Sequence, residues 1–220
     1  IELKLEVQAK LGSIGNVLDT TPEPNSEEEI STSREIQALG AAFEGAYSQN
    51  SWTFKLQSGI ATGDSEGSYL GVRDGSNTIE PEGISQSEAE AYRKNQTYEQ
   101  YIFHQDYFAD VILFREAVGA ITNTVFLRPS VVYQFGEGAN RYTIEGGVMP
   151  AWALAPESTP GKSRSFGVEA DLKFKYSPSE NLNLVWTMAG LKPGAALAAS
   201  EGADAPAALV STQLDLFIKF

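Results

Sequence analysis

The chain has 220 residues, of which 42% are apolar and 20% charged, and its formal net charge is −13. So acidic a protein is a poor candidate for binding nucleic acid, whose partners are basic. Cysteine is absent, which excludes disulfides, thiol chemistry and cysteine metal sites. No apolar run approaches the roughly 20 residues that a membrane-spanning helix needs. Strands that cross a membrane escape this test, because their apolar residues come at every second position.

Three strands are predicted in the first third of the chain. Residues 1–11 alternate between apolar and charged side chains almost without error, as expected of a strand with two different faces. The acidic, proline-containing segment 19–33 is predicted to be an exposed loop. The second strand is expected at 34–47 and the third at 52–60, joined by the tight turn SQNS. A strand that starts at the first residue, in a sequence without an initial Met, leads us to expect further chain upstream.

The segment 62–121 breaks this rhythm. It starts with glycine and acidic residues, includes a short predicted helix at 85–94, and becomes aromatic at YEQYIFHQDYF. The run that follows, DVILFREAVGAI, is amphipathic and could plug or lid a barrel, or pack on its rim. The sequence does not separate these alternatives. So long a connection is usually functional or disordered, and its aromatic content favours order.

Five more strands are predicted: 123–135, 142–154, 166–176, 182–189 and 209–220. The short turn GEGAN joins the first pair, and SPSEN joins the third to the fourth. Pro129 and Pro150 lie inside strands, where proline cannot donate to the ladder, so we expect a bulge at Pro129 and a second irregularity at Pro150. In the last strand, one face is apolar and the other carries both signs of charge.

Eight strands with apolar faces about ten residues long predict an all-β protein, a transmembrane antiparallel up-and-down β-barrel. Residues 1–220 are treated as a single domain with an insertion at 62–121. Long and short connections alternate, so we expect both termini and the short turns to be periplasmic. The expected extracellular loops are 19–33, 62–121, 155–163 and 194–207. The alternative is a soluble β-sandwich or a lipocalin-like barrel.

Aromatic residues recur at outward positions near the predicted strand ends. Trp152 follows Tyr142 by ten residues, and Tyr176 follows Phe166 by the same interval. This spacing is close to the roughly 9–11 residues with which a tilted strand crosses a bilayer. We therefore predict an aromatic girdle of the type found in membrane barrels. Its members are Tyr47, Trp52, Tyr133, Phe135, Tyr142, Trp152, Phe166, Tyr176 and Phe220.

Charged residues on the strands are assigned to the lumen, because Lys or Arg turned to lipid at the bilayer midplane costs roughly 2–4 kcal/mol. Acids and bases balance among them, so the whole excess of −13 falls on loops and rims. This balance fits either the salt-bridged filling of a narrow barrel or the wall of a polar pore. Small inward residues such as Gly40 and Gly59 fit both interpretations, because they make room for long charged neighbours or leave a channel open. The predicted lumen-lining residues are Glu2, Lys4, Glu6, Lys10, Glu44, Lys55, Arg128, Glu145, Glu169, Asp171, Lys173, Lys175, Asp215 and Lys219.

No catalytic site is predicted, and the chain is expected to be neither an enzyme nor a cofactor protein. Its single histidine, His104, lies in the long segment and is expected to form only local hydrogen bonds. Asp64, Glu66 and Asp74 offer the oxygen ligands that Ca²⁺ prefers, but they lack the spacing of an EF-hand loop. An acidic, solvated loop is the favoured interpretation of these three residues.

Three stretches carry a resemblance to a known family: IQALGAAFEGAY…ATGD, YIFHQDYFADVILFREAVGAITNTVFLRPSVVY and TPGKSRSFGVEADLKFKYSPSENLNLVWTMAGLKPGAAL. Together they resemble the C-terminal part of large outer-membrane barrels of myxobacteria and related deltaproteobacteria, which are distantly similar to alginate-export porins. The terminal Phe resembles the C-terminal insertion signal of bacterial outer-membrane proteins. The resemblance implies an outer-membrane location in a Gram-negative bacterium, a transport-like role, and a barrel of more than eight strands.

From these features we expect a porin-like barrel in the lipid bilayer of the outer membrane, for the passive passage of small polar or saccharide solutes. The alternative is a non-conducting structural or assembly barrel whose extracellular loops bind a partner complex. Either the first and last strands pair with each other, or other strands lie between them. The wider barrel is the favoured alternative.

Overall fold

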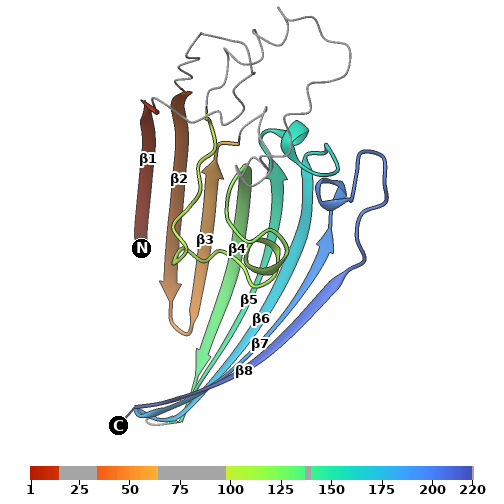
Figure 1. Cartoon of the computed structure of the whole chain (residues 1–220). Coiled ribbons are helices and arrows are strands. Elements are labelled where there is room, and N and C mark those ends of the chain that lie inside the picture. The colour runs from red at the N-terminus through yellow and green to blue at the C-terminus, as the bar shows by residue number, and fades with distance from the viewer. Residues whose placement is uncertain (15–33, 64–97, 137–139, 220) are drawn as a thin grey trace, which may run out of the picture.

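The computed structural model describes residues 1–14, 34–63, 98–136 and 140–219. Eight strands form one sheet, in which each strand pairs in antiparallel fashion with its neighbours in the sequence. Figure 1 shows the strands side by side in chain order, from β1 at one edge to β8 at the other. The prediction of an all-β fold with eight antiparallel up-and-down strands is therefore confirmed.

The strands are 10 to 16 residues long. They are β1 (Glu2–Ile14), β2 (Arg34–Gln49), β3 (Trp52–Ala61), β4 (Thr124–Phe135), β5 (Arg141–Ala153), β6 (Ser165–Ser179), β7 (Leu182–Pro193) and β8 (Leu209–Ile218). Helical structure is confined to three short turns, η1 (Leu113–Ala117), η2 (Pro156–Ser158) and η3 (Ala195–Leu197). Among the described residues, none of these helices has the length and apolar character that crossing a membrane requires.

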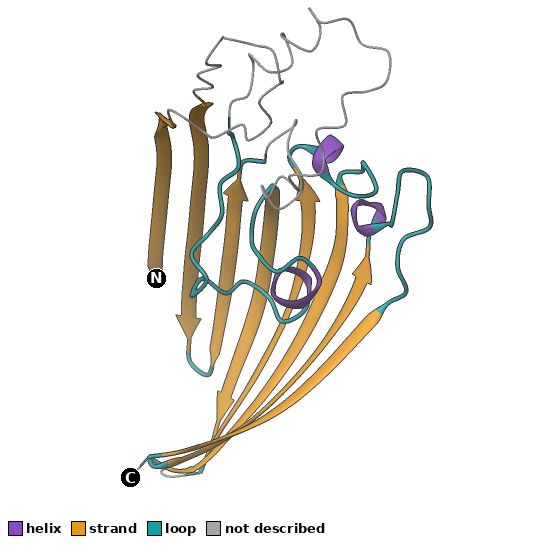
Figure 2. Cartoon of the chain, in the orientation of Figure 1, coloured by secondary structure: helices purple, strands orange, loops and turns teal. Residues whose placement is uncertain are grey.

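The two faces of the sheet differ as the alternation predicts. Residues 98–123 cross one face as an irregular chain, which Figure 2 draws in front of the strands. We call this segment the inner segment and the face it covers the inner face. On the opposite, outer face, large apolar side chains stay exposed on every strand, among them Leu56, Leu127 and Leu172.

The ladder is irregular at Pro150, as predicted, but it departs from the expectation at Pro129. Strands β4 and β5 lose their pairing from Leu127 to Pro129, opposite Val148 to Pro150, but the register is the same on both sides of the gap. The predicted bulge at Pro129 was therefore wrong. Pro129 lacks a backbone N–H, and the hydrogen bonds between β4 and β5 are interrupted there without an inserted residue.

A register shift does occur in β6, and it corrects one further prediction. Ala151 pairs with Gly167 but Trp152 pairs with Ser165, so Phe166 is the extra residue of a bulge. Gly167 has φ +118°, a conformation that glycine adopts without strain. The bulge reverses the alternation, and Phe166 lies buried on the inner face. The expectation that Phe166 faces outward in the aromatic girdle was wrong.

The sheet has two free edges. Within the described residues, β1 pairs only with β2 and β8 pairs only with β7. Among the described residues, the sheet is therefore open, with no pairing between β8 and β1.

Candidate functional site: the inner face and its segment

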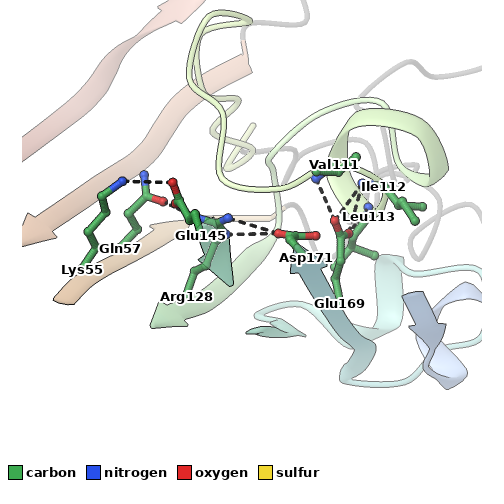
Figure 3. Close-up of polar contacts among 9 residues, drawn as sticks. All are labelled: Lys55, Gln57, Val111, Ile112, Leu113, Arg128, Glu145, Glu169 and Asp171. Carbon is green, nitrogen blue, oxygen red and sulfur yellow. Dashed lines mark hydrogen bonds and ion pairs between the residues drawn. The ribbon is translucent and has the colours of Figure 1, made fainter. Parts of the chain in front are cut away.

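Inward charges from four neighbouring strands form one network at mid-height of the inner face (Figure 3). Lys55 Nζ lies 3.2 Å from Glu145 Oε2, and Arg128 Nη1 lies 3.9 Å from Glu145 Oε1. Arg128 Nη2 lies 3.2 Å from Asp171 Oδ2, and Arg128 Nη1 donates a hydrogen bond to Gln57 Oε1 at 3.0 Å. The charges of four residues predicted to line the lumen, two acids and two bases, are therefore paired across β3, β4, β5 and β6.

The strand register explains how these side chains meet. Gln57 is directly opposite Arg128, and Gly147 is directly opposite Asp171. A Cβ atom at Gly147 would lie 3.5 Å from Arg128 Nη2, an ordinary van der Waals contact, so the guanidinium crosses β5 directly beside this residue. Arg128 and Asp171 are both largely buried. In such surroundings a charge needs its partner, because breaking a buried ion pair leaves an uncompensated charge.

Glu169 holds the inner segment to the sheet. Its carboxylate accepts backbone N–H groups from Val111 at 2.7 Å, Ile112 at 3.0 and 3.1 Å, and Leu113 at 2.7 Å (Figure 3). The side chain is fully buried on β6. Consecutive backbone N–H groups form a concave anion site, and here the anion is a side chain of the same chain.

A second carboxylate stabilises the same turn from within the segment. Asp110 Oδ2 accepts the backbone N–H of Phe114, in η1. Burial, with the neighbouring carboxylate of Glu169 as a smaller cause, raises the pKa of Asp110 to about 6. Two acidic groups thus meet where the segment touches β6, and Asp110 takes up a proton at a pH well above its usual range.

Apolar packing seals this half of the inner face. The Phe114 ring centroid lies 6.0 Å from that of Phe126 on β4 and 6.1 Å from that of Phe166 on β6. Met149 of β5 and Leu191 of β7 belong to the same buried cluster. The segment therefore excludes water from the inner face of β4 to β7 at this level.

The other end of the segment reaches β1. The Tyr101 hydroxyl is hydrogen-bonded to Gln8 Oε1, and Lys10 Nζ lies 5.1 Å from the centre of the Tyr101 ring. A Cβ atom at Gly40 would lie 2.1 Å from the ring of Tyr101, and one at Gly59 would lie 2.4 Å from Phe126. These two small inward residues thus make room for aromatic rings of the inner segment and of β4.

The remaining predicted lumen-lining residues are not brought into the network of Figure 3. Most are exposed, those of β1 throughout, while Glu44, Lys175 and Asp215 are partly buried. They are Glu2, Lys4, Glu6, Lys10, Glu44, Lys173, Lys175, Asp215 and Lys219. The buried apolar contacts of the inner segment thus extend across β4 to β7, and Tyr101 reaches β1, while exposed charges remain on β1, on β6 and at the end of β8.

Aromatic residues on the outer face form a row at the end of the sheet where the short turns lie. Ring centroids are separated by 4.4 Å between Trp52 and Tyr133, 5.5 Å between Tyr133 and Phe135, and 5.0 Å between Phe135 and Tyr142. Tyr176 continues the row at 4.8 Å from Tyr142. Tyr47 and Trp152 are exposed, whereas Phe220 lies outside the described residues.

In the described part of the chain, no three His, Cys, Asp or Glu side chains lie close enough together to hold a metal ion. His104 is exposed, with its Nδ1 atom 3.5 Å from Asp106 Oδ2 and 3.3 Å from the backbone N–H of Asp106. This local pairing is the one the sequence predicts. The calcium candidates Asp64, Glu66 and Asp74 and the helix predicted at 85–94 fall outside the described residues.

Sequence reasoning placed Glu169 on the inner face but missed its partner. A signal was present, because Phe126, Met149 and Leu191 are apolar at positions that the alternation assigns to a polar interior. Apolar residues on the polar side of three strands indicate that something apolar covers them there.

Comparison with known proteins adds no relative: no family model matches the sequence, and no curated protein or solved structure matches the chain.

Proposed function

We propose that the chain forms the wall of a porin-like barrel in the outer membrane, through which small polar or saccharide solutes pass. The observation that carries this proposal is the contrast between the two faces. Exposed apolar side chains occur on the outer face of all eight strands, whereas the inner face holds a buried ion network. Soluble monomers rarely expose apolar patches larger than a few hundred Å², and a lipid bilayer is a solvent suited to such a face.

Strand length and the aromatic row support the same proposal. All eight strands reach the roughly 9–11 residues that a tilted transmembrane strand needs. The row from Trp52 to Tyr176 lies at one end of the outer face, where membrane barrels carry an aromatic girdle. Both termini and the short turns are then periplasmic.

In this proposal the inner segment narrows the pore. It closes the half of the lumen beneath β4 to β7, and solutes pass along the accessible charges near β1, β2 and β3. Lys10 and Glu44 line that route, and Lys55, whose side chain is 38% exposed, borders it.

The dry packing of the inner segment favours a second function, a non-conducting barrel whose loops bind a partner complex. In that case the segment and its partners seal the lumen, and the ion network is purely structural. Recordings in planar bilayers separate the two functions.

The test reconstitutes the purified protein into a planar bilayer. Discrete conductance steps are expected, with an ion selectivity that shifts when Lys10→Glu reverses one charge of the route. Lys162→Glu, on the exposed connection between β5 and β6, is the matched control and should leave selectivity unchanged. Inserted protein that passes no current would contradict the porin function and support the sealed barrel.

A further inference from the structure

The inner segment is tied to the sheet at both ends and through one buried carboxylate between them. At its C-terminal end, Asn123 Nδ2 donates to the Ala155 carbonyl at 2.9 Å, and Asn123 Oδ1 accepts the Ala155 N–H at 2.7 Å. At its N-terminal end, the backbone of Tyr98 is hydrogen-bonded to β2. Between these ends, the turn that leads into η1 is held by the carboxylate of Glu169. A change at this contact therefore acts on the middle of the segment while both ends stay attached.

Three buried carboxylates form a row at this contact, with Glu169 in the middle. Asp110 of the inner segment lies on one side of Glu169, and Asp171 of β6 lies on the other. Figure 3 shows the Asp171 oxygen that is not bonded to Arg128 directed toward Glu169. None of the three acids is more than 9% exposed. Negative charges this close together in a dry site need compensation to stay ionised.

The surroundings compensate two of these three charges. Arg128 lies 3.2 Å from Asp171, and three backbone N–H groups of the segment bond to Glu169. The neighbouring strands bring no further cation, because Met149 and Leu191 are the residues opposite Glu169 on β5 and β7. The charged groups that face the row come from the segment and from β3 to β5, and they are Arg115, Lys55, Arg128 and Glu145.

Asp110 is the carboxylate without a cation of its own. Among the described residues it forms no ion pair, and its Oδ2 atom accepts the N–H of Phe114. The guanidinium of Arg115, on the same segment, lies over the Phe108 ring at 4.5 Å. At the other end of the row, Asp171 Oδ1 is buried and accepts no hydrogen bond. The row thus lacks one positive charge and one donor, and a single proton supplies both.

We propose that the inner segment is a proton-operated gate: one proton bound by the row of carboxylates holds the segment on β6, and its loss releases the middle of the segment into the lumen. This inference rests on the proposed pore. The docked segment leaves a narrow passage, and the released segment leaves a wider one.

The direction of the response follows from Asp110. Burial, with the neighbouring Glu169 as a smaller cause, raises the pKa of Asp110 from 3.8 to about 6 in the docked segment. The docked segment therefore binds the proton more tightly than the released one. Docking is strongest below the usual pKa and weakens as the pH rises through about 6. The gate closes in acid and loosens near neutral pH.

Cysteine labelling measures release without reference to conductance, because the chain has no native cysteine. Ala109→Cys places a thiol in the buried cluster between the segment and the sheet. Ala117→Cys, at an exposed position of the same segment, is the matched control for the reactivity of the thiol itself. In lipid vesicles, the ratio of the two labelling rates should rise about tenfold between about pH 5 and about pH 7.

Two substitutions locate the proton. Asp110→Asn is neutral at every pH and keeps an oxygen for the Phe114 N–H, so the labelling ratio should stay low throughout. Asp106→Asn removes an exposed acid of the same segment, which meets His104, and should keep the wild-type rise. In planar bilayers, the time spent in a larger-conductance state should rise over the same pH interval in the wild type and in Asp106→Asn, but not in Asp110→Asn.

Each outcome decides a different part of the proposal. A labelling ratio that does not change with pH in otherwise wild-type protein would overturn the gate, and so would an Asp110→Asn variant that keeps the wild-type rise. A ratio that rises while the conductance states keep their proportions would show that the segment does not gate the pore. A ratio that rises in inserted protein that passes no current would contradict the proposed pore alone and would support proton-controlled docking.

Discussion

The attachment of the inner segment to β6 gives the sharpest prediction. Glu169→Ala removes the acceptor of the N–H groups of Val111, Ile112 and Leu113, which are paired with Glu169 at 2.7–3.1 Å. Each buried donor left without a partner costs about 1–3 kcal/mol. Water that enters the vacated space recovers part of this cost. We therefore expect the segment to lose about 3 kcal/mol of local stability.

Amide hydrogen exchange measures this loss at the three donors themselves. Because 1.4 kcal/mol corresponds to a factor of ten, exchange at residues 111–113 should become about a hundredfold faster. Glu169→Gln keeps the shape but turns an N–H₂ group toward backbone N–H donors, so its effect should be smaller and in the same direction. Core amides of β5 to β7 should keep their protection in both variants.

Glu145→Gln is the matched control. Glu145 is an inward carboxylate in the same network, but its contacts are to Lys55 and Arg128 and not to the inner segment. Exchange at residues 111–113 should stay at the wild-type rate in this variant. Equal acceleration by Glu145→Gln and Glu169→Ala, or no acceleration by Glu169→Ala, would refute the assigned role of Glu169.

Three further predictions follow from the same contacts. Gly40→Val should release the Tyr101 end of the segment and raise its susceptibility to protease, because a Cβ atom there would lie 2.1 Å from the ring, whereas Gly12→Val, in open space, should not. The raised pKa of Asp110, about 6 against the usual 3.8, means that the docked segment binds the proton more tightly. The docked segment should therefore gain up to about 3 kcal/mol of local stability as pH falls from about 7 to about 4. Exchange at residues 111–113, corrected for the intrinsic pH dependence, should slow accordingly, and Asp110→Asn should abolish this change. Leu172→Arg should impair folding into lipid vesicles by roughly 2–4 kcal/mol, as measured by denaturant titration against Leu172→Met; unimpaired folding would contradict the lipid-facing assignment.

Most of the sheet follows from the sequence because alternation is a local property. Residues such as Lys55, Arg128 and Asp171 are polar between apolar neighbours, and that pattern alone assigns their face. The short turns force three pairs of consecutive strands to be neighbours, β2 with β3, β4 with β5 and β6 with β7, whereas the other pairings join strands across long connections. Both deductions need only residues close together in the chain.

Two features lay beyond such reasoning. Phe166 changes face because a single glycine, Gly167, adopts a positive φ, and nothing in the alternation of the following residues signals the reversal. The partners of Glu169 are backbone N–H groups that lie 56–58 residues away in the chain, in the inner segment. A backbone N–H has no sequence identity, so donors of this kind cannot be recognised from residue types.

The charge balance of the inner face is better understood from these contacts than from composition. Seen as a composition, equal numbers of acids and bases fit a sealed lumen and an open pore alike. In the structure the charges divide by position: Arg128 and Asp171 are buried and paired, whereas Glu6 and Lys10 on β1 are exposed. Buried pairs have little freedom to exchange partners with a passing solute, but exposed charges do. In the proposed pore, selectivity is therefore expected to depend on the exposed charges of β1 rather than on the buried pair.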